Sequence, residues 1–160
     1  MAGDGRAAAE TGLHLLLDDL RADPYACETV WVAAVTFGSV ADVAVMPTPL
    51  EEFQPLPLYT HGSSPLGEAL ELARECIAAE YVAPDFRPVA FVVTDGEPTD
   101  RWQKPAQRLA GVASVVLCGA ARLTTPVPTL APAFVRLRDA TPGTFRSLVN
   151  WVPGMSQETR

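Results

Sequence analysis

Leucines at helical spacing open the chain, and continuous apolar runs follow them. The leucine pattern predicts a helix over residues 6–21 that ends at Asp23-Pro24, with a buried stripe made of Leu13, Leu16, Leu17 and Leu20. Residues 29–37 are apolar and rich in β-branched side chains, which predicts a strand covered on both faces, with Trp31 in the core. Gly38-Ser39 then predicts a two-residue type II′ turn into an antiparallel strand over residues 40–46.

Loops, helices and strands alternate through the rest of the chain. Residues 47–61 hold four prolines and are predicted to form an extended surface loop. Ser64 as N-cap and Pro65 in the first turn predict a helix over residues 65–81. Further apolar patterns predict strands over residues 88–95, 112–118 and 133–137, and helices over residues 101–110 and 142–151.

This alternation predicts an α/β fold with a mainly parallel sheet, helices on both faces, and one antiparallel edge strand from the hairpin. A length of 160 residues fits a single domain, which we place at residues 1–152, with a tail at 153–160. The first predicted element is a helix with no strand before it. Because ligands of such sheets bind at the carboxyl ends of the strands, the loops at those ends are the candidate binding segments.

The chain is acidic, with a net charge of −7. This charge argues against binding to nucleic acid or to anionic membranes. No apolar run approaches the ~18 residues that a membrane span needs. The three widely spaced cysteines, Cys27, Cys76 and Cys118, are expected to be small buried residues of a reducing compartment, so we expect a cytoplasmic protein.

Two segments carry residues suited to chemistry. Asp95 follows a predicted strand and precedes a glycine, which is a common way to present a metal ligand or a catalytic acid. Ser64 stands at a helix start, where its hydroxyl can complete an oxygen-rich site for a hard cation. In the alternative interpretation Ser64 only caps the helix and Asp95 only caps a turn. We expect the two residues to approach each other at one end of the sheet.

Other catalytic patterns are weak. The phosphate-binding glycine loops and the GxSxG elbow are absent from the sequence. A Ser/His/Asp set drawn from Ser64, His61 and Asp95 is disfavoured, because nothing orients a histidine only three residues from the serine. Trp102 is expected to be exposed near Asp95.

The segments RADPYACETVW (21–31), VTF (35–37), GSSPLGEAL (62–70) and VTDGEPTD (93–100) resemble von Willebrand factor A-type domains. Within that family they are most similar to the bacterial subgroup associated with tellurium-resistance gene clusters. The resemblance covers residues 5–151 and implies a Rossmann-like fold with a metal-ion-dependent adhesion site. Ser64 stands where the family has a threonine ligand, and Asp95 stands where it has the distal aspartate.

The resemblance also implies that a piece of the fold is missing. The family's DxSxS segment, and the strand that carries it, have no counterpart here, and Met1 aligns just after that motif. We therefore expect the codons upstream of Met1 to encode an apolar strand ending in Asp-x-Ser-x-Ser. In the family this strand lies between the hairpin and the strand ending at Asp95, so its loss leaves two strand edges unpaired.

The resemblance implies a non-enzymatic protein-interaction module of a tellurium- or stress-resistance system. Its partners are expected to be proteins of the same gene cluster, such as kinase- or phosphatase-like proteins, with no role for nucleic acid or membrane. The expected partner-binding loops contain Gly62, Ser63, Gly96, Glu97 and Asp100. The intact family binds Mg²⁺ or Mn²⁺, and we expect weak or no binding to this incomplete site. The alternative is a metal-assisted hydrolase or phosphatase of α/β fold that uses Asp95.

Overall fold

The computed structural model describes residues 4–58, 62–79, 87–94, 98–119 and 133–144. Its elements run in chain order as follows: α1 (Asp4–Arg21), α2 (Pro24–Thr29), β1 (Trp31–Phe37), β2 (Ala41–Pro49), α3 (Leu66–Ala79), β3 (Val89–Thr94), α4 (Gln103–Val112), β4 (Ser114–Gly119), β5 (Ala133–Arg136) and the 3₁₀ helix η2 (Leu137–Asp139). The predicted helix over residues 142–151 and the predicted tail lie largely outside the described residues. Among the helices described, none combines the length and apolar character needed to cross a bilayer.

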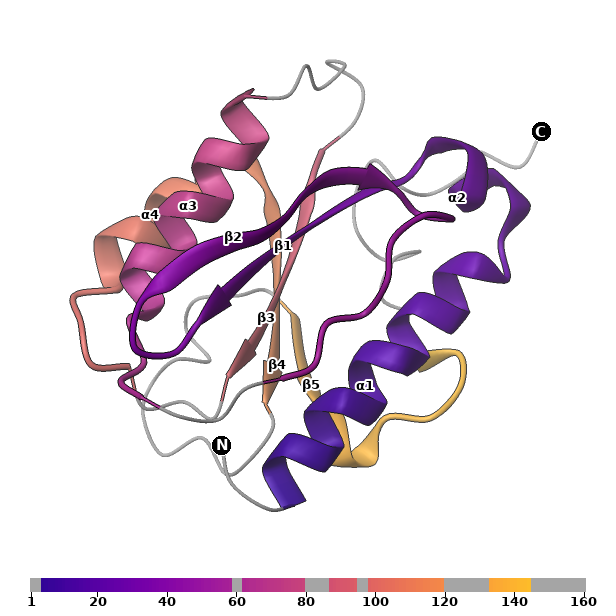
Figure 1. Cartoon of the computed structure of the whole chain (residues 1–160), viewed down its shortest axis with the longest axis horizontal. Coiled ribbons are helices and arrows are strands. Elements are labelled where there is room, and N and C mark those ends of the chain that lie inside the picture. Colours follow the sequence, from indigo (N-terminus) through magenta and orange to yellow (C-terminus); the bar gives the residue numbers. More distant parts are fainter. Residues whose placement is uncertain (1–3, 59–61, 80–86, 95–97, 120–132, 145–160) are drawn as a thin grey trace.

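The fold is mixed α/β, and its strands form two sheets (Figure 1). One sheet is the antiparallel pair β1–β2, and the other is a parallel sheet of order β3-β4-β5. The predicted α/β class, the parallel sheet and the antiparallel pairing of the hairpin are confirmed, whereas among the described residues the hairpin does not join the parallel sheet as its edge strand. The described strands and the helices α1, α3 and α4 lie where their hydrophobic patterns predict, whereas α2 was not predicted.

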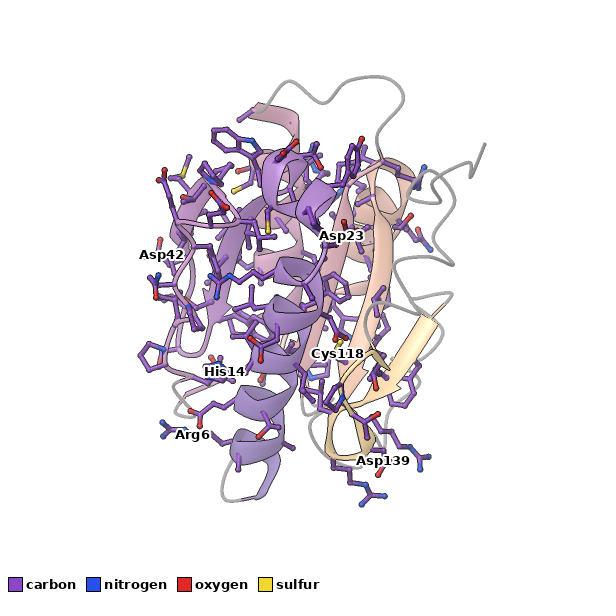
Figure 2. All side chains as sticks on the ribbon, turned by 90° about the vertical axis from the view of Figure 1, so that its right-hand side faces the viewer. Arg6, His14, Asp23, Asp42, Cys118 and Asp139 are labelled. Atoms are coloured by element: carbon purple, nitrogen blue, oxygen red, sulfur yellow. The ribbon has the colours of Figure 1, made fainter. Side chains whose placement is uncertain are left out.

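Helices cover both faces of the strands. On one side α1 packs Leu16 against Val116 and Val135 of the parallel sheet. The adjacent Leu17 belongs to a second cluster, formed with residues of α2 and the hairpin. On the opposite side α3 and α4 cover the parallel sheet, in a cluster that includes Leu70 and Leu109. Figure 2 shows α1 running between the hairpin, which carries Asp42, and the strands on the side of Cys118.

The hairpin departs from its predicted form. Phe37 pairs with Ala41, so the connection is the three-residue stretch 38–40. Among the described glycines only Gly62 and Gly143 have positive φ, so Gly38 does not form the type II′ turn that was predicted. Trp31 is 63% exposed rather than part of the core. The apolar run indicated a strand correctly, but Trp31 stands at the exposed start of β1, whereas Phe37 at the other end of the strand packs with the α3–α4 cluster.

The proline-rich stretch after the hairpin is not purely a surface loop. Pro47 and Pro49 belong to β2, and the turn that follows buries Leu50 and Phe53 against α1 and α2. The Arg21 guanidinium at the end of α1 donates hydrogen bonds to the carbonyl oxygens of these two residues, at 3.3 and 2.5 Å. These hydrogen bonds fix the turn to α1, although the two segments lie far apart along the chain.

Candidate functional site

The two loops expected to form the site meet through a pair of hydrogen bonds. The Ser64 backbone N–H donates to the Thr99 hydroxyl oxygen at 3.1 Å. The Thr99 backbone N–H donates in return to the Ser64 carbonyl oxygen at 2.9 Å. The segment that enters α3 and the segment that enters α4 are thus held side by side.

Asp100 provides the N-terminal cap of α3. Its two carboxylate oxygens accept hydrogen bonds from the backbone N–H groups of Gly67 at 2.9 Å and Glu68 at 3.0 Å. The N–H of Leu66 donates to the Ser64 carbonyl, and that of Ala69 donates to the Pro65 carbonyl. All the amide groups of the first helical turn therefore have acceptors. A carboxylate at this end is also favoured by the helix dipole.

This arrangement corrects the expected role of the Ser64 hydroxyl. The sequence predicted that this side chain would cap α3, but Asp100, from a loop more than 30 residues later, accepts the bonds instead. Ser64 contributes through its backbone and is half-buried. The same geometry gives Asp100, predicted to lie in a partner-binding loop, a structural role, because each of its carboxylate oxygens already accepts a backbone hydrogen bond.

Close packing at the cap depends on a glycine. A Cβ atom at Gly67 would lie 2.9 Å from the Arg101 carbonyl oxygen and 3.1 Å from the Trp102 Cα. Both distances are shorter than ordinary contacts with carbon, so the loop can approach α3 only because position 67 has no side chain. Trp102 itself is half-buried and packs with the α3–α4 cluster, which corrects the expectation that it is exposed.

A third loop, the connection between β1 and β2, joins the other two. The Ser63 hydroxyl donates to the carbonyl oxygens of Gly38 and Ser39, each at 3.4 Å. Gly62 has a φ of +112°, and a Cβ there would lie 2.5 Å from the Ser39 backbone nitrogen. We call residues 38–40, 62–64 and 98–100 the three-loop surface. The three-loop surface lies where β1 ends and α3 begins (Figure 1).

Several expected site residues lie outside the described part of the chain. These are Asp95, Gly96, Glu97 and His61, so the predicted approach of Asp95 to Ser64 stays a prediction. The last described residue before Asp95 is Thr94, which ends β3 and is 3% exposed. The described residues hold no group of three or more His, Cys, Asp or Glu side chains that fits a metal ion.

Cys118 is unsuited to be a nucleophile. It lies buried in β4, and burial raises the pKa of its thiol to about 12. The expectation of a small buried residue is confirmed for Cys118, whereas Cys27 and Cys76 are only half-buried. The Cys27 thiol donates to the Arg21 carbonyl oxygen at 3.4 Å.

Thr99 and Gly67 lie in segments that the sequence singled out, but the sequence interpretation gave them no role of their own, and it missed Ser39 altogether. The sequence of Thr99-Asp100 just before a predicted helix was a usable signal, since both residue types commonly bond backbone amides near helix starts. No protein-family model, curated protein or solved structure matches the chain. The chemistry of the three-loop surface is therefore inferred from its own residues.

Proposed function

We propose that this chain is a non-enzymatic protein-interaction module that binds its partner at the three-loop surface. The observation that carries the proposal is the mutual fastening of the loops by Ser64, Thr99 and Asp100. Loops held in one conformation lose little freedom when a partner binds, so more of the contact energy appears as affinity. Gly62, Ser63 and Thr99 are exposed on this surface and present polar groups to a partner.

The polar groups at the described surface suit recognition better than turnover. Hydroxyls and backbone groups form hydrogen bonds that select a partner, whereas nucleophilic catalysis requires a base next to the nucleophile. The carboxylate of Asp100, which belongs to the three-loop surface, is engaged by two backbone amides. The alternative of a metal-assisted hydrolase or phosphatase rests on Asp95. Hydrolase or phosphatase activity of the chain that depends on Asp95 would therefore replace this proposal.

We further propose that the fold is that of a Rossmann-like von Willebrand factor A-type domain without its first strand. The separation of β1–β2 from β3-β4-β5 supports this, because the resemblance expects the missing strand between β1 and β3. Ser64 and Asp95 are the proposed remainder of the metal site. Mg²⁺ or Mn²⁺ would take carboxylate and hydroxyl oxygens there, and a single carboxylate holds such a strongly hydrated ion weakly.

The proposed setting is a cytoplasmic tellurium- or stress-resistance system, with a kinase- or phosphatase-like protein from the same gene cluster as partner. Affinity for each purified candidate, measured by calorimetry, tests this. The variant Ser63→Arg places a bulky charge on the three-loop surface and is expected to weaken binding at least tenfold. The matched variant Gln107→Arg, on the exposed side of α4, is expected to leave binding unchanged.

Two results would overturn the proposed function. One is an equal effect of Ser63→Arg and Gln107→Arg on every partner that binds. The other is turnover of generic ester or phosphate substrates that is lost in Asp95→Asn while the circular dichroism spectrum stays unchanged.

A further inference from the structure

An exposed apolar face lies at the end of the hairpin where β1 begins and β2 ends. Trp31 and Met46 are 63% and 61% exposed. Ala33, which is also exposed, stands opposite Met46 and the residue after it in the register of the two strands. The strand neighbours Val32 and Val45 point the other way, into the cluster formed with α1 and α2. Single exposed apolar residues are ordinary, but a contiguous group of them is typical of an interaction site.

Carboxylates flank this apolar face. Helix α2 lies beside the same end of the hairpin (Figure 1). On α2, Tyr25 is 48% exposed, and the exposed Glu28 lies three residues later on the same side of the helix. Two further exposed glutamates stand in the turn that follows Pro49, the residue that pairs with Trp31. We define the acidic hairpin end as Tyr25, Glu28, Trp31, Met46, Glu51 and Glu52.

The two glutamates of the turn are held in place by the residues on either side of them. Leu50 and Phe53 are 0% and 3% exposed, and the Arg21 guanidinium donates hydrogen bonds to both of their carbonyl oxygens. The Leu50 N–H donates in addition to the Val30 carbonyl oxygen at 3.0 Å, between α2 and β1. Because both flanks are fixed, the turn loses little backbone freedom when a ligand binds to its carboxylates.

The negative charge of this region is not balanced by nearby basic residues of the sequence. The chain has no lysine or arginine between Arg21 and Arg74, a stretch that contains seven aspartates and glutamates. In the part of the chain that the structure describes, Glu28, Glu51 and Glu52 form no ion pair. A positively charged ligand is therefore attracted to this surface, whereas a second copy of the acidic chain is repelled from it.

We propose that the acidic hairpin end binds a basic, arginine-bearing segment of another protein. The Trp31 indole offers a face on which a guanidinium stacks, and Tyr25 adds a second exposed ring. The flanking glutamates offer carboxylate oxygens for its N–H groups, and Met46 and Ala33 offer apolar surface for the aliphatic stems of arginine side chains. Arginine fits better than lysine, because a guanidinium stacks on a ring and pairs with a carboxylate at the same time.

This inference goes beyond the proposed function and does not rest on it. The acidic hairpin end lies at the opposite end of the hairpin from residues 38–40, which belong to the three-loop surface (Figure 1). The two surfaces therefore bind different ligands independently, and variants of one leave the other intact.

A synthetic peptide of alternating arginine and serine residues is the probe, and calorimetry with the purified chain measures its affinity. One control peptide has citrulline in place of each arginine, which keeps the shape and removes the charge. The other has lysine, which keeps the charge and removes the planar guanidinium. We expect saturable one-to-one binding of the arginine peptide, at least tenfold weaker binding of the citrulline form and about threefold weaker binding of the lysine form. Equal affinity for the arginine peptide and either control would overturn the proposal, as would the absence of saturable binding.

Variants of exposed residues locate the binding surface, with circular dichroism as the check on folding. Trp31→Ala is expected to weaken binding of the arginine peptide about fivefold, and Trp31→Phe is expected to weaken it less because it keeps an aromatic face. The double variant Glu51→Lys, Glu52→Lys is expected to weaken binding at least tenfold. The matched control is Glu75→Lys, Asp139→Lys, which adds the same charge at side chains that are 64% and 62% exposed on other elements. Equal weakening by both double variants would mean that only net charge attracts the peptide, and it would overturn the proposal.

The Trp31 indole N–H provides a direct spectroscopic readout. Its NMR signal is assigned by its absence from Trp31→Phe, and it is expected to shift during titration with the arginine peptide. The Trp102 indole, which packs with the α3–α4 cluster, is expected to stay unchanged.

Ser63→Arg separates this inference from the proposed function, because it alters the three-loop surface and is expected to leave the affinity for the arginine peptide nearly unchanged. Loss of peptide binding in Ser63→Arg but not in Trp31→Ala would place the peptide on the three-loop surface and overturn the inference. A dimer in sedimentation that dissociates in Trp31→Ala would also overturn it, since a second copy of the chain would then be the occupant.

Discussion

The carboxylate of Asp100 caps helix α3 at Gly67, with the Gly67 N–H donating to Asp100 Oδ1 at 2.9 Å. The second oxygen accepts from the next amide of the helix at 3.0 Å. One side chain thereby fixes the loop before α4 to the first turn of α3, and it does so beside the Ser64–Thr99 hydrogen bonds. The three-loop surface depends on this cap for its shape.

Removal of the cap is expected to destabilise the protein. Asp100→Ala leaves two amides of the first helical turn without their acceptor, and loss of an N-cap costs about 0.5–2 kcal/mol. The unfolding free energy from urea titration measures the change. Asp100→Asn retains one acceptor oxygen and is expected to lose less stability. Arg101→Ala, at an exposed neighbouring position, serves as the control, and an equal loss in this variant would contradict the role of the cap.

Two helical glycines are expected to respond in opposite directions to the same substitution. Gly67→Ala places a Cβ 2.9 Å from the Arg101 carbonyl, and overpacking of this kind costs about 1–3 kcal/mol. Gly111 lies on α4, and a Cβ added there would meet no other group within 4 Å, so Gly111→Ala is expected to stabilise by about 0.5–1 kcal/mol through helix propensity. Thermal unfolding of both variants checks the pair. Stabilisation by Gly67→Ala would refute the close approach.

The ion pairs of Glu71, with Arg74 on α3 and with Arg108 on α4, are expected to weaken in acid. Hydrogen bonding from Arg74, with a further contribution from Arg108, lowers the pKa of Glu71 below its ordinary value of 4.5. A lowered folded-state pKa stabilises the protein above about pH 4.5, and this contribution is lost as the pH falls through the folded-state pKa.

Urea unfolding at neutral pH and below pH 4 measures this effect. The unmodified chain is expected to lose more stability between the two conditions than Glu71→Gln does. Glu75→Gln is the control, because the Glu75 side chain is 64% exposed and lies 3.9 Å from Arg74. A steeper pH dependence of the unfolding free energy in Glu71→Gln than in the unmodified chain would show that Glu71 does not lose a stabilising contribution as the pH falls.

We expect the chain to bind Mg²⁺ and Mn²⁺ weakly or not at all. Only Ser64 and Asp95 match the ligands of the resembling family, and Asp100 is engaged at the α3 cap. Most of the coordination shell would then be water. Isothermal titration with each cation checks this, with Asp95→Ala as the companion variant. Saturable binding at micromolar cation that disappears in Asp95→Ala would mean that other residues complete the site.

Local patterns in the sequence predicted the main elements well, because each one depends on its own residues. The leucine spacing of α1 and the uncharged run of β3 are sufficient for this. Asp23-Pro24 was interpreted only as the end of a helix, although the Asp23 carboxylate also caps α2 at 3.0 Å. The Asp23-Pro24 pair therefore marks both the end of α1 and the start of α2, and the second signal was overlooked.

Features that depend on distant partners were not predictable in the same way. Trp31 is exposed at the start of β1, and an apolar run does not indicate which of its residues lie at an uncovered end of the strand. Leu50 and Phe53 are buried because Arg21 fixes their turn to α1. The choice of Asp100 over Ser64 as the cap depends on how two loops meet in space. These long-range contacts also determine the candidate site.

The most direct test of the proposed function is the hydrogen-exchange footprint of a bound partner. The chain is mixed with the kinase- or phosphatase-like protein of its gene cluster that binds it most tightly, and amide exchange is compared with that of the free chain. The proposal predicts slower exchange at residues 38–40, 62–64 and 98–100, with α4 unchanged. Protection confined to α4 or to the outer edge of β2, with these loops unaffected, would contradict it.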